Sequence, residues 1–343
     1  MDNFVRLSSG ERSSYCRQAS ERMESPLPAA VIEKDFWVCW TLHLLNQVSE
    51  LNGNITFKGG TSLSKAWNMI DRFSEDLDIA VNRKLFGQAP PLGAEDAGSN
   101  TQRKLRLEEL QEKSDAFIQH VILPQLMVLM ERWLKPGEFR LSAVKKGNEV
   151  NIEFEYPGAL KDGLGGLLPV VLIELVPRAD DIPNELRPIT PILNEVFPEL
   201  LGEGTFHVPT LAPERTLLEK LLMIHETLAG FAKGSERKSR HYYDLFRLHQ
   251  AGVFGRVKND RRLFNAVIEH RRTFFRYNSM DYQGVLQKGV GIIPGAGSLR
   301  DWRSDYDRSA AMFHGERPSF DELIHFATEF EQEFNAWVVL RCN

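Results

Sequence analysis

Apolar residues recur every three or four positions over residues 28–50, where Val31, Trp37 and Leu44 belong to the series. This spacing predicts a helix that starts near Pro28. The same period continues from Pro213 to Leu248 and returns over 320–339 as a stripe of phenylalanines ending in Trp337. We expect that stripe to be core packing.

Short segments in the first half of the chain have the patterns of strands instead. Their ranges are 55–57, 75–81, 140–144, 149–156 and 170–176, with turns at 146–148 and 163–166. The segment 149–156 alternates apolar and polar residues, so we expect one of its faces to be wet.

Between these strands the sequence predicts a turn over 58–62, a helix over 63–70 and a loop over 86–100. A long helix over 106–134 follows, in which Pro124 predicts a kink or a break. The predicted fold class is therefore α/β (α+β). We expect residues 1–205 to form a mixed β-sheet flanked by helices and residues 206–343 to form a mainly helical domain.

The composition, with 42% hydrophobic and 26% charged residues in a chain of 343, is that of a globular protein of about two domains. Cys16, Cys39 and Cys342 have no CxxC spacing, which argues against a disulfide framework or a Cys-rich zinc site and predicts a reducing, cytoplasmic location. The N-terminus is polar and no apolar run reaches eighteen residues, so we expect neither a secretory signal nor a membrane span.

The most informative stretch, residues 57–81, reads FKGGTSLSKAWNMIDRFSEDLDIAV. It combines a strand, a Gly-Gly-Thr-Ser turn, a helix and a second strand that carries Asp76 and Asp78. Residues at i and i+2 of a strand point to the same face. Two charges about 4 Å apart repel by roughly 4 kcal/mol at an effective dielectric constant near 20. A divalent cation such as Mg²⁺, bound between the two carboxylates, would offset this repulsion.

Phosphate can approach the turn closely because Gly59 and Gly60 lack side chains, while Thr61 and Ser62 can donate hydrogen bonds to it. A third carboxylate on a neighbouring strand usually completes such a metal site, and Glu174 lies inside an apolar strand. Each signal alone has a simpler explanation, such as solvated acids or an ion pair between Glu174 and Arg178. Their ordered combination favours phosphoryl or nucleotidyl transfer from a nucleoside triphosphate (NTP).

The sequence resembles the AbiEii/AbiGii abortive-infection toxins, nucleotidyltransferase-like proteins of the polymerase-β-type superfamily. The similarity lies in FKGGTSLSKAW…RFSEDLDI, in APERTLLEKLLMIHE (212–226), in SRHYYDLFRL (239–248) and in residues 300–324. The turn departs from the Gly-Ser of the wider superfamily, and position 174 has Glu in place of Asp.

The resemblance implies a bacterial toxin of a toxin–antitoxin, phage-defence system that transfers a nucleotide from an NTP with Mg²⁺ or Mn²⁺. The expected metal ligands are Asp76, Asp78 and Glu174, and Lys220 and Asp244 match later family motifs and join the catalytic set. The expected nucleotide-binding residues are Lys58, Gly59, Gly60, Thr61, Ser62, Lys65 and Lys220. An RNA acceptor, specifically the tRNA 3′ end, and a cognate antitoxin encoded nearby are the implied partners.

The residues of the second half leave several roles open. Lys220 either extends to solvent or reaches a phosphate. Asp244 either pairs with Arg240 at i, i+4 or orients Lys220. Arg215 either reaches phosphate or pairs with Glu219.

A basic region lies between residues 231 and 277, where twelve Lys or Arg outnumber four acids. Interleaved aromatic residues suit an RNA acceptor. A solvated helical surface and an antitoxin-binding surface are the alternatives. The candidate RNA- or partner-binding residues are Arg237, Lys238, Arg240, Arg261, Arg262, Arg271 and Arg272.

Two other functions are consistent with the same residues. One is a nucleotidyltransferase that acts on a protein or on a small molecule such as an aminoglycoside. The other is a non-catalytic module that binds RNA or a partner, although the intact set of acids counts against it.

Overall fold

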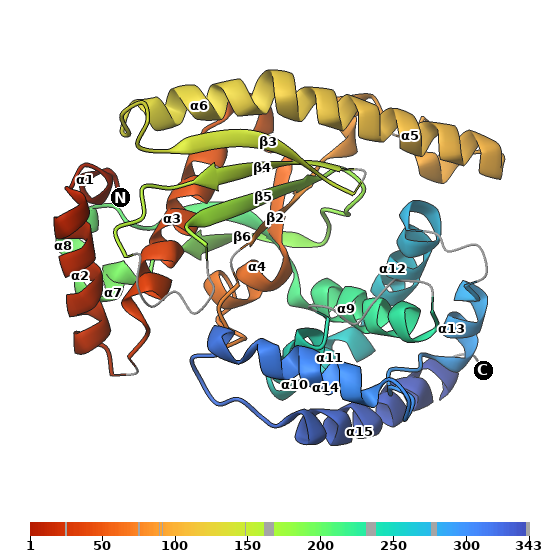
Figure 1. The fold of residues 1–343 in the computed structure, drawn as a ribbon. Coiled ribbons are helices and arrows are strands. Elements are labelled where there is room, and N and C mark those ends of the chain that lie inside the picture. Colours follow the sequence, from red (N-terminus) through yellow and green to blue (C-terminus); the bar gives the residue numbers. More distant parts are fainter. Residues whose placement is uncertain are drawn as a thin grey trace. The chain divides into compact units, whose positions relative to one another are not determined.

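The computed structural model describes residues 1–24, 26–74, 76–88, 90, 92–147, 149–160, 168–230, 238–275 and 280–340 (Figure 1). The chain forms two compact units. The first comprises Met1–Trp67 and Phe73–Leu211, and the second comprises Asn68–Arg72 and the chain from Ala212 onward. The predicted fold class, a mixed α/β part and a mostly helical part, is confirmed.

The first unit is built on a seven-stranded sheet in the order β3-β4-β5-β2-β1-β7-β6. Strand β2 is parallel to β5 and β1 is parallel to β7, whereas the other neighbours are antiparallel. The strand bounds are β1 Ile55–Lys58, β2 Asp76–Val81, β3 Arg140–Lys146, β4 Glu149–Glu155, β5 Val170–Val176, β6 Asn184–Ile189 and β7 Phe206–Leu211. The first five agree with the sequence patterns, and β6 and β7 were not predicted.

One face of the sheet packs against α3 (Ala29–Leu45), which is buried along nearly its whole length because it is apolar on most sides. Trp40 of α3 lies 5.9 Å from the ring of Phe154 in β4. The predicted alternation of β4 is confirmed, since Ile152 and Phe154 are buried and Glu153 and Glu155 are half-buried on the other face.

The predicted long helix is interrupted where Pro124 suggested a break. Helix α5 (Asn100–Phe117) passes into a π-helical stretch, Ile118–Ile122, and then into α6 (Leu123–Glu131). Proline has no N–H to donate to the preceding turn, which explains the irregular hydrogen bonding there. Figure 1 shows α5 and α6 as one long rod, with α6 beside β3.

The remaining helices of this unit are short except for α2. They are α1 Asp2–Val5, α2 Ser9–Arg22, α4 Gly59–Lys65, α7 Leu193–Val196 and α8 Pro198–Leu201. The sequence prediction of a helix over 63–70 was wrong in its bounds. Helix α4 begins at Gly59, inside the predicted turn, because Gly59 adopts a φ of +77° and lets the chain turn directly from β1 into the helix.

The second unit packs helices around α9 (Pro213–Leu228). The others are α10 Arg240–Gln250, α11 Val253–Lys258, α12 Arg261–Phe274, α13 Tyr282–Lys288, α14 Leu299–Arg308 and α15 Phe320–Leu340. The predicted stripe of α15 is core, since Phe330, Phe334 and Trp337 are buried. The ring of Phe334 lies 5.7 Å from that of Phe254 in α11.

Candidate active site

Three predicted metal ligands share one face of the sheet. Asp76 and Asp78 are two residues apart in β2, and Asp78 pairs directly with Glu174 across the parallel β2–β5 ladder. On the other side of β2, Asp78 pairs with Lys58 of β1. Register partners and i, i+2 neighbours point to the same face. The four charged side chains therefore stand together on the face opposite α3.

The carboxylate of Asp78 packs directly against the glycine turn. A β-carbon at Gly59 would lie 2.0 Å from Asp78 Oδ2, closer than any real contact. Gly59 also has a positive φ, which side chains disfavour. Both the backbone conformation and the neighbouring carboxylate therefore require glycine at this position.

We expect Gly59→Ala to lower transfer activity by at least about tenfold, because the new methyl group must displace the Asp78 carboxylate. Gly53→Ala is the matched control, since Gly53 has a φ of +69° and no atom within 4 Å of its would-be β-carbon. Both variants should lose about 1–2 kcal/mol of unfolding free energy from backbone strain. Equal activity of the two variants would contradict a role for the Gly59–Asp78 contact.

The hydroxyls of the turn are engaged within the protein. Thr61 Oγ1 donates to the Asp76 carbonyl at 2.5 Å, and Ser62 Oγ donates to the Gly59 carbonyl at 2.9 Å. Both side chains are buried. The Thr61 hydroxyl therefore ties α4 to β2, whereas the Ser62 hydroxyl bonds within α4. The backbone of Gly59 and Gly60 is the part suited to close approach of a phosphate.

The donor chemistry of the acidic face fits a divalent metal. Among the described residues, no three His, Cys, Asp or Glu side chains converge closely enough to form a complete metal site. Glu174 Oε1 instead lies 3.2 Å from Lys146 Nζ, and Lys146 is largely exposed. Mg²⁺ is usually held by one or two carboxylates together with substrate phosphates. Asp76 and Asp78 suit that mode without a third protein ligand.

The predicted Lys220 and Asp244 meet in a buried charge cluster of the helical unit. Lys220 Nζ lies 2.8 Å from Asp244 Oδ2, so Asp244 orients Lys220, as one of the sequence alternatives proposed. Arg72 Nε and Nη2 contact the two oxygens of the same carboxylate at 2.6 and 2.7 Å. The Asp244 side chain is 0% exposed. Two cations therefore converge on one buried carboxylate.

Burial and charge set the ionisation of this cluster. Burial alone would raise the pKa of Asp244, but Arg72 and Lys220 outweigh it and hold that pKa well below its usual value. Burial lowers the pKa of Lys220, an effect that Asp244 opposes and Arg72 reinforces. Burial, together with Lys220, lowers the pKa of His241 to about 3. His241 Nδ1 lies 3.4 Å from Lys220 Nζ, so the imidazole is neutral beside the ammonium.

The neutral His241 predicts a specific loss of stability in acid. Below pH 6.5 the histidine is protonated in the unfolded chain but not in the folded protein, so the unfolding free energy falls between about pH 6.5 and 3. The contribution of His241 to the unfolding free energy changes by at most about 1.4 kcal/mol per pH unit. His241→Asn should remove this contribution, measured by urea denaturation at several pH values. An unchanged pH slope in the variant would contradict the buried neutral state.

The predicted RNA-binding residues have different environments. Arg271 is buried in an ion pair with Glu226, and the guanidinium of Arg261 stacks at 5.0 Å on the rings of Phe264 and Trp337. Arg262 and Arg272 are exposed on α12. Lys238 and Arg240 are half-buried, and Arg237 lies outside the described residues. Arg215, the other open case, pairs with Glu219 at 3.0 Å.

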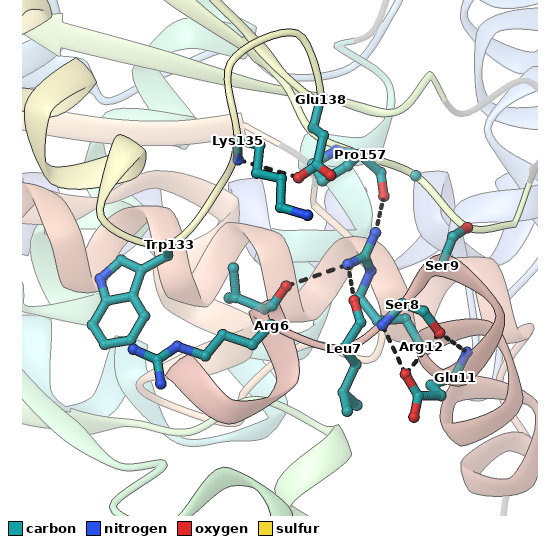
Figure 2. Close-up of a pocket in the computed structure, with 12 residues that line it drawn as sticks. Arg6, Leu7, Ser8, Ser9, Glu11, Arg12, Trp133, Lys135, Glu138 and Pro157 are labelled. Carbon is teal, nitrogen blue, oxygen red and sulfur yellow. Dashed lines mark hydrogen bonds between the residues drawn. The ribbon is translucent and has the colours of Figure 1, made fainter.

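A cavity of about 820 Å³ lies elsewhere in the first unit, and no predicted site residue lines it. Figure 2 shows its wall formed by the α1–α2 turn, the start of α2 and the segment between α6 and β3. Arg6 stacks on Trp133 at 4.5 Å, and Arg12 donates to the carbonyls of Leu7 and Pro157. Three basic and two acidic side chains line the cavity, so the charge of its lining favours neither anionic nor cationic ligands.

Several buried charged residues were not predicted from the sequence. Glu33, Lys34 and Asp35 are consecutive and fully buried in α3. Arg72, the main partner of Asp244, was also missed. Three adjacent charges inside an otherwise apolar helix are the signal that would have marked the first group, because charged residues are seldom buried without a partner.

Residues 43–326 match the family model described as "Nucleotidyl transferase AbiEii toxin, Type IV TA system", and the chain belongs to this family. It is therefore a nucleotidyltransferase toxin of a type IV toxin–antitoxin system, with an NTP as substrate and an antitoxin as partner.

Among solved structures, MenT4, a nucleotidyltransferase toxin from Mycobacterium tuberculosis H37Rv, aligns at 18% identity and a TM-score of 0.43. The alignment covers 97% of this chain and 99% of MenT4. No curated protein matches the sequence. Within the described residues, no helix is both long and apolar enough to cross a bilayer.

Proposed function

We propose that the protein transfers a nucleoside monophosphate from an NTP to an RNA acceptor, specifically the 3′ end of tRNA, and so blocks translation. The observation that supports this most is the row of Lys58, Asp78 and Glu174 across three strands, with Asp76 on the same face and Gly59 against Asp78. This arrangement combines metal-binding oxygens with a backbone that a phosphate can approach.

Asp76 and Asp78 would hold the divalent metal, with Glu174 as a third ligand once Lys146 is displaced. A pair of acids on one rigid strand keeps its spacing when substrate binds, which suits precise metal placement. The bound Mg²⁺ or Mn²⁺ would neutralise charge on the phosphates during displacement. The ion pair between Glu174 and Lys146 is largely solvent-exposed and contributes little free energy, so a metal ion can replace Lys146 at Glu174.

The chain's own groups have defined tasks in the reaction. The acceptor hydroxyl gives its proton to a carboxylate of the acidic face or to bulk base, attacks the α-phosphate and expels pyrophosphate. Lys58 and the backbone of Gly59 and Gly60 bind the phosphates of the NTP. Lys220, which pairs with Asp244, matches a later family motif, and we expect it to supply positive charge during nucleotidyl transfer.

An RNA acceptor is supported by the excess of basic residues in the helical unit. Arg262 and Arg272 are exposed on α12, and Lys238 and Arg240 are partly accessible at the start of α10. Basic side chains of this kind attract a phosphate backbone regardless of the nucleotide sequence. An acceptor of this kind places the toxin's action in the cytoplasm, and we expect the antitoxin to be encoded nearby.

The test is transfer from each of the four α-labelled triphosphates in turn, offered with total cell RNA, total protein or an aminoglycoside. We expect the label in the tRNA fraction, removed by digestion of the 3′ end, and no transfer after chelation of divalent metal. Label in protein or in the small molecule would overturn the RNA acceptor. Transfer that persists in chelator would overturn the role of the acidic face.

A further inference from the structure

Three consecutive charged residues of α3 tie that helix to three different segments of the first unit. Glu33, Lys34 and Asp35 are only 1%, 1% and 2% exposed. Successive side chains on a helix point about 100° apart, so each reaches a different neighbour. The Glu33 carboxylate accepts from the N–H groups of Ala159 and Leu160, and Lys34 Nζ donates to the Leu168 carbonyl.

The third residue, Asp35, connects α3 to the helix that begins with the glycine turn. Asp35 Oδ1 lies 2.7 Å from Nζ of Lys65, the last residue of α4, and Oδ2 accepts from the Ile192 N–H at 2.7 Å. Burial lowers the pKa of Lys65, but Asp35 outweighs this and the pKa is raised overall. The ammonium is therefore firmly charged, and it is directed to Asp35 in the protein interior.

Helix α4 depends on such ties for its position. It has seven residues, too few to be stable alone. Gly59 packs on the Asp78 carboxylate at its first residue, Thr61 bonds the Asp76 carbonyl in the middle, and Lys65 pairs with Asp35 at its last residue. The first two ties join α4 to the acidic strand, and the third joins it to the sheet's packing helix.

We propose that Lys65 and Asp35 are positioning residues, which hold α4 in register with β2 so that the glycine turn meets the phosphates at a fixed distance from the carboxylates. This inference rests on the proposed function of the turn, and it gives Lys65 a role other than contact with the nucleotide. An ion pair suits the task because its geometry is directional, whereas an apolar contact tolerates sliding. In some proteins a buried ion pair contributes to structural specificity and not to stability, and we assign that role to this pair.

The test compares Lys65→Met, Asp35→Asn and the double variant with wild type, using kcat and KM for the NTP together with the melting temperature. Lys65→Met leaves a buried carboxylate unpaired and is destabilised. The double variant removes both charges and recovers most of the melting temperature. Because small misplacements are costly in catalysis, we expect its kcat/KM to remain about a hundredfold below wild type.

Lys34→Met is the matched control, since Lys34 is a buried lysine of the same helix whose Nζ donates to the Leu168 carbonyl. We expect Lys34→Met to lower the melting temperature without changing KM for the NTP. Recovery of wild-type kcat/KM in the double variant would overturn the inference, because the pair would then be only structural. Unchanged activity in Asp78→Asn would instead overturn the proposed function, so the two failures can be told apart.

Discussion

Replacing Asp78 by asparagine is expected to abolish nucleotide transfer and toxicity while the protein stays folded. Asparagine keeps the shape that packs against Gly59 but lacks the charge that a divalent cation requires. Metal charge stabilisation amounts to several kcal/mol, and about 1.4 kcal/mol corresponds to tenfold in rate. We therefore expect kcat/KM to fall by at least about 10³-fold. Asp76→Asn should behave in the same way.

The matched control for Asp78→Asn is Glu155→Gln, which neutralises another acid on the same face of the sheet. Glu155 lies in β4 and pairs with Arg140 at 3.4 Å, away from the glycine turn. Growth arrest on induction and transfer to RNA should both survive in Glu155→Gln. A toxic, transfer-competent Asp76→Asn/Asp78→Asn double variant would refute the assignment of the acidic face.

Replacing Asp244 by alanine is expected to have the largest effect on stability. The substitution leaves Arg72 and Lys220 in a buried environment without the carboxylate that both contact. Breaking a buried ion pair in this way costs about 3–5 kcal/mol, a large part of the 5–15 kcal/mol of a typical domain. The measurement is urea denaturation, and Asp301→Ala, at an exposed position of α14, is the control.

Lys220→Met separates the two roles of this cluster. The bidentate contact between Arg72 and Asp244 remains in that variant, so its loss of unfolding free energy should be smaller than that of Asp244→Ala. If Lys220 neutralises phosphate charge, kcat/KM should fall by about 10²-fold. A folded Lys220→Met variant with full activity would make the lysine a structural residue only.

The sequence predicted the elements with a clear local pattern. Strands β2 and β4 agree because apolar and polar residues alternate along them, whereas α3 and β5 are mostly apolar runs of different length. Strands β6 and β7 were missed. Strand β6 is a largely exposed edge strand that contains Pro188. Strand β7 alternates in burial from Phe206 to Thr210, but Pro209 argues against a strand there.

The site was predictable where chemistry and spacing coincide. Asp76 and Asp78 lie on one face because i, i+2 spacing in a strand requires it, but the register that sets Glu174 opposite Asp78 depends on long-range pairing. The local sequence also does not determine the direction of the Lys65 side chain. Its partner Asp35 lies thirty residues earlier, and a lysine next to a glycine turn reads as a phosphate ligand unless that partner is known.

The assignment of Asn68–Arg72 to the helical unit bears on how this architecture can change. The five residues supply the guanidinium that holds Asp244, yet they are encoded between the glycine turn and the acidic strand. A fragment starting at Ala212 would lack that guanidinium, so trimming or fusing genes at this boundary would yield a defective helical half. A separately expressed helical half would therefore need residues 68–72 supplied to restore the partner of Asp244.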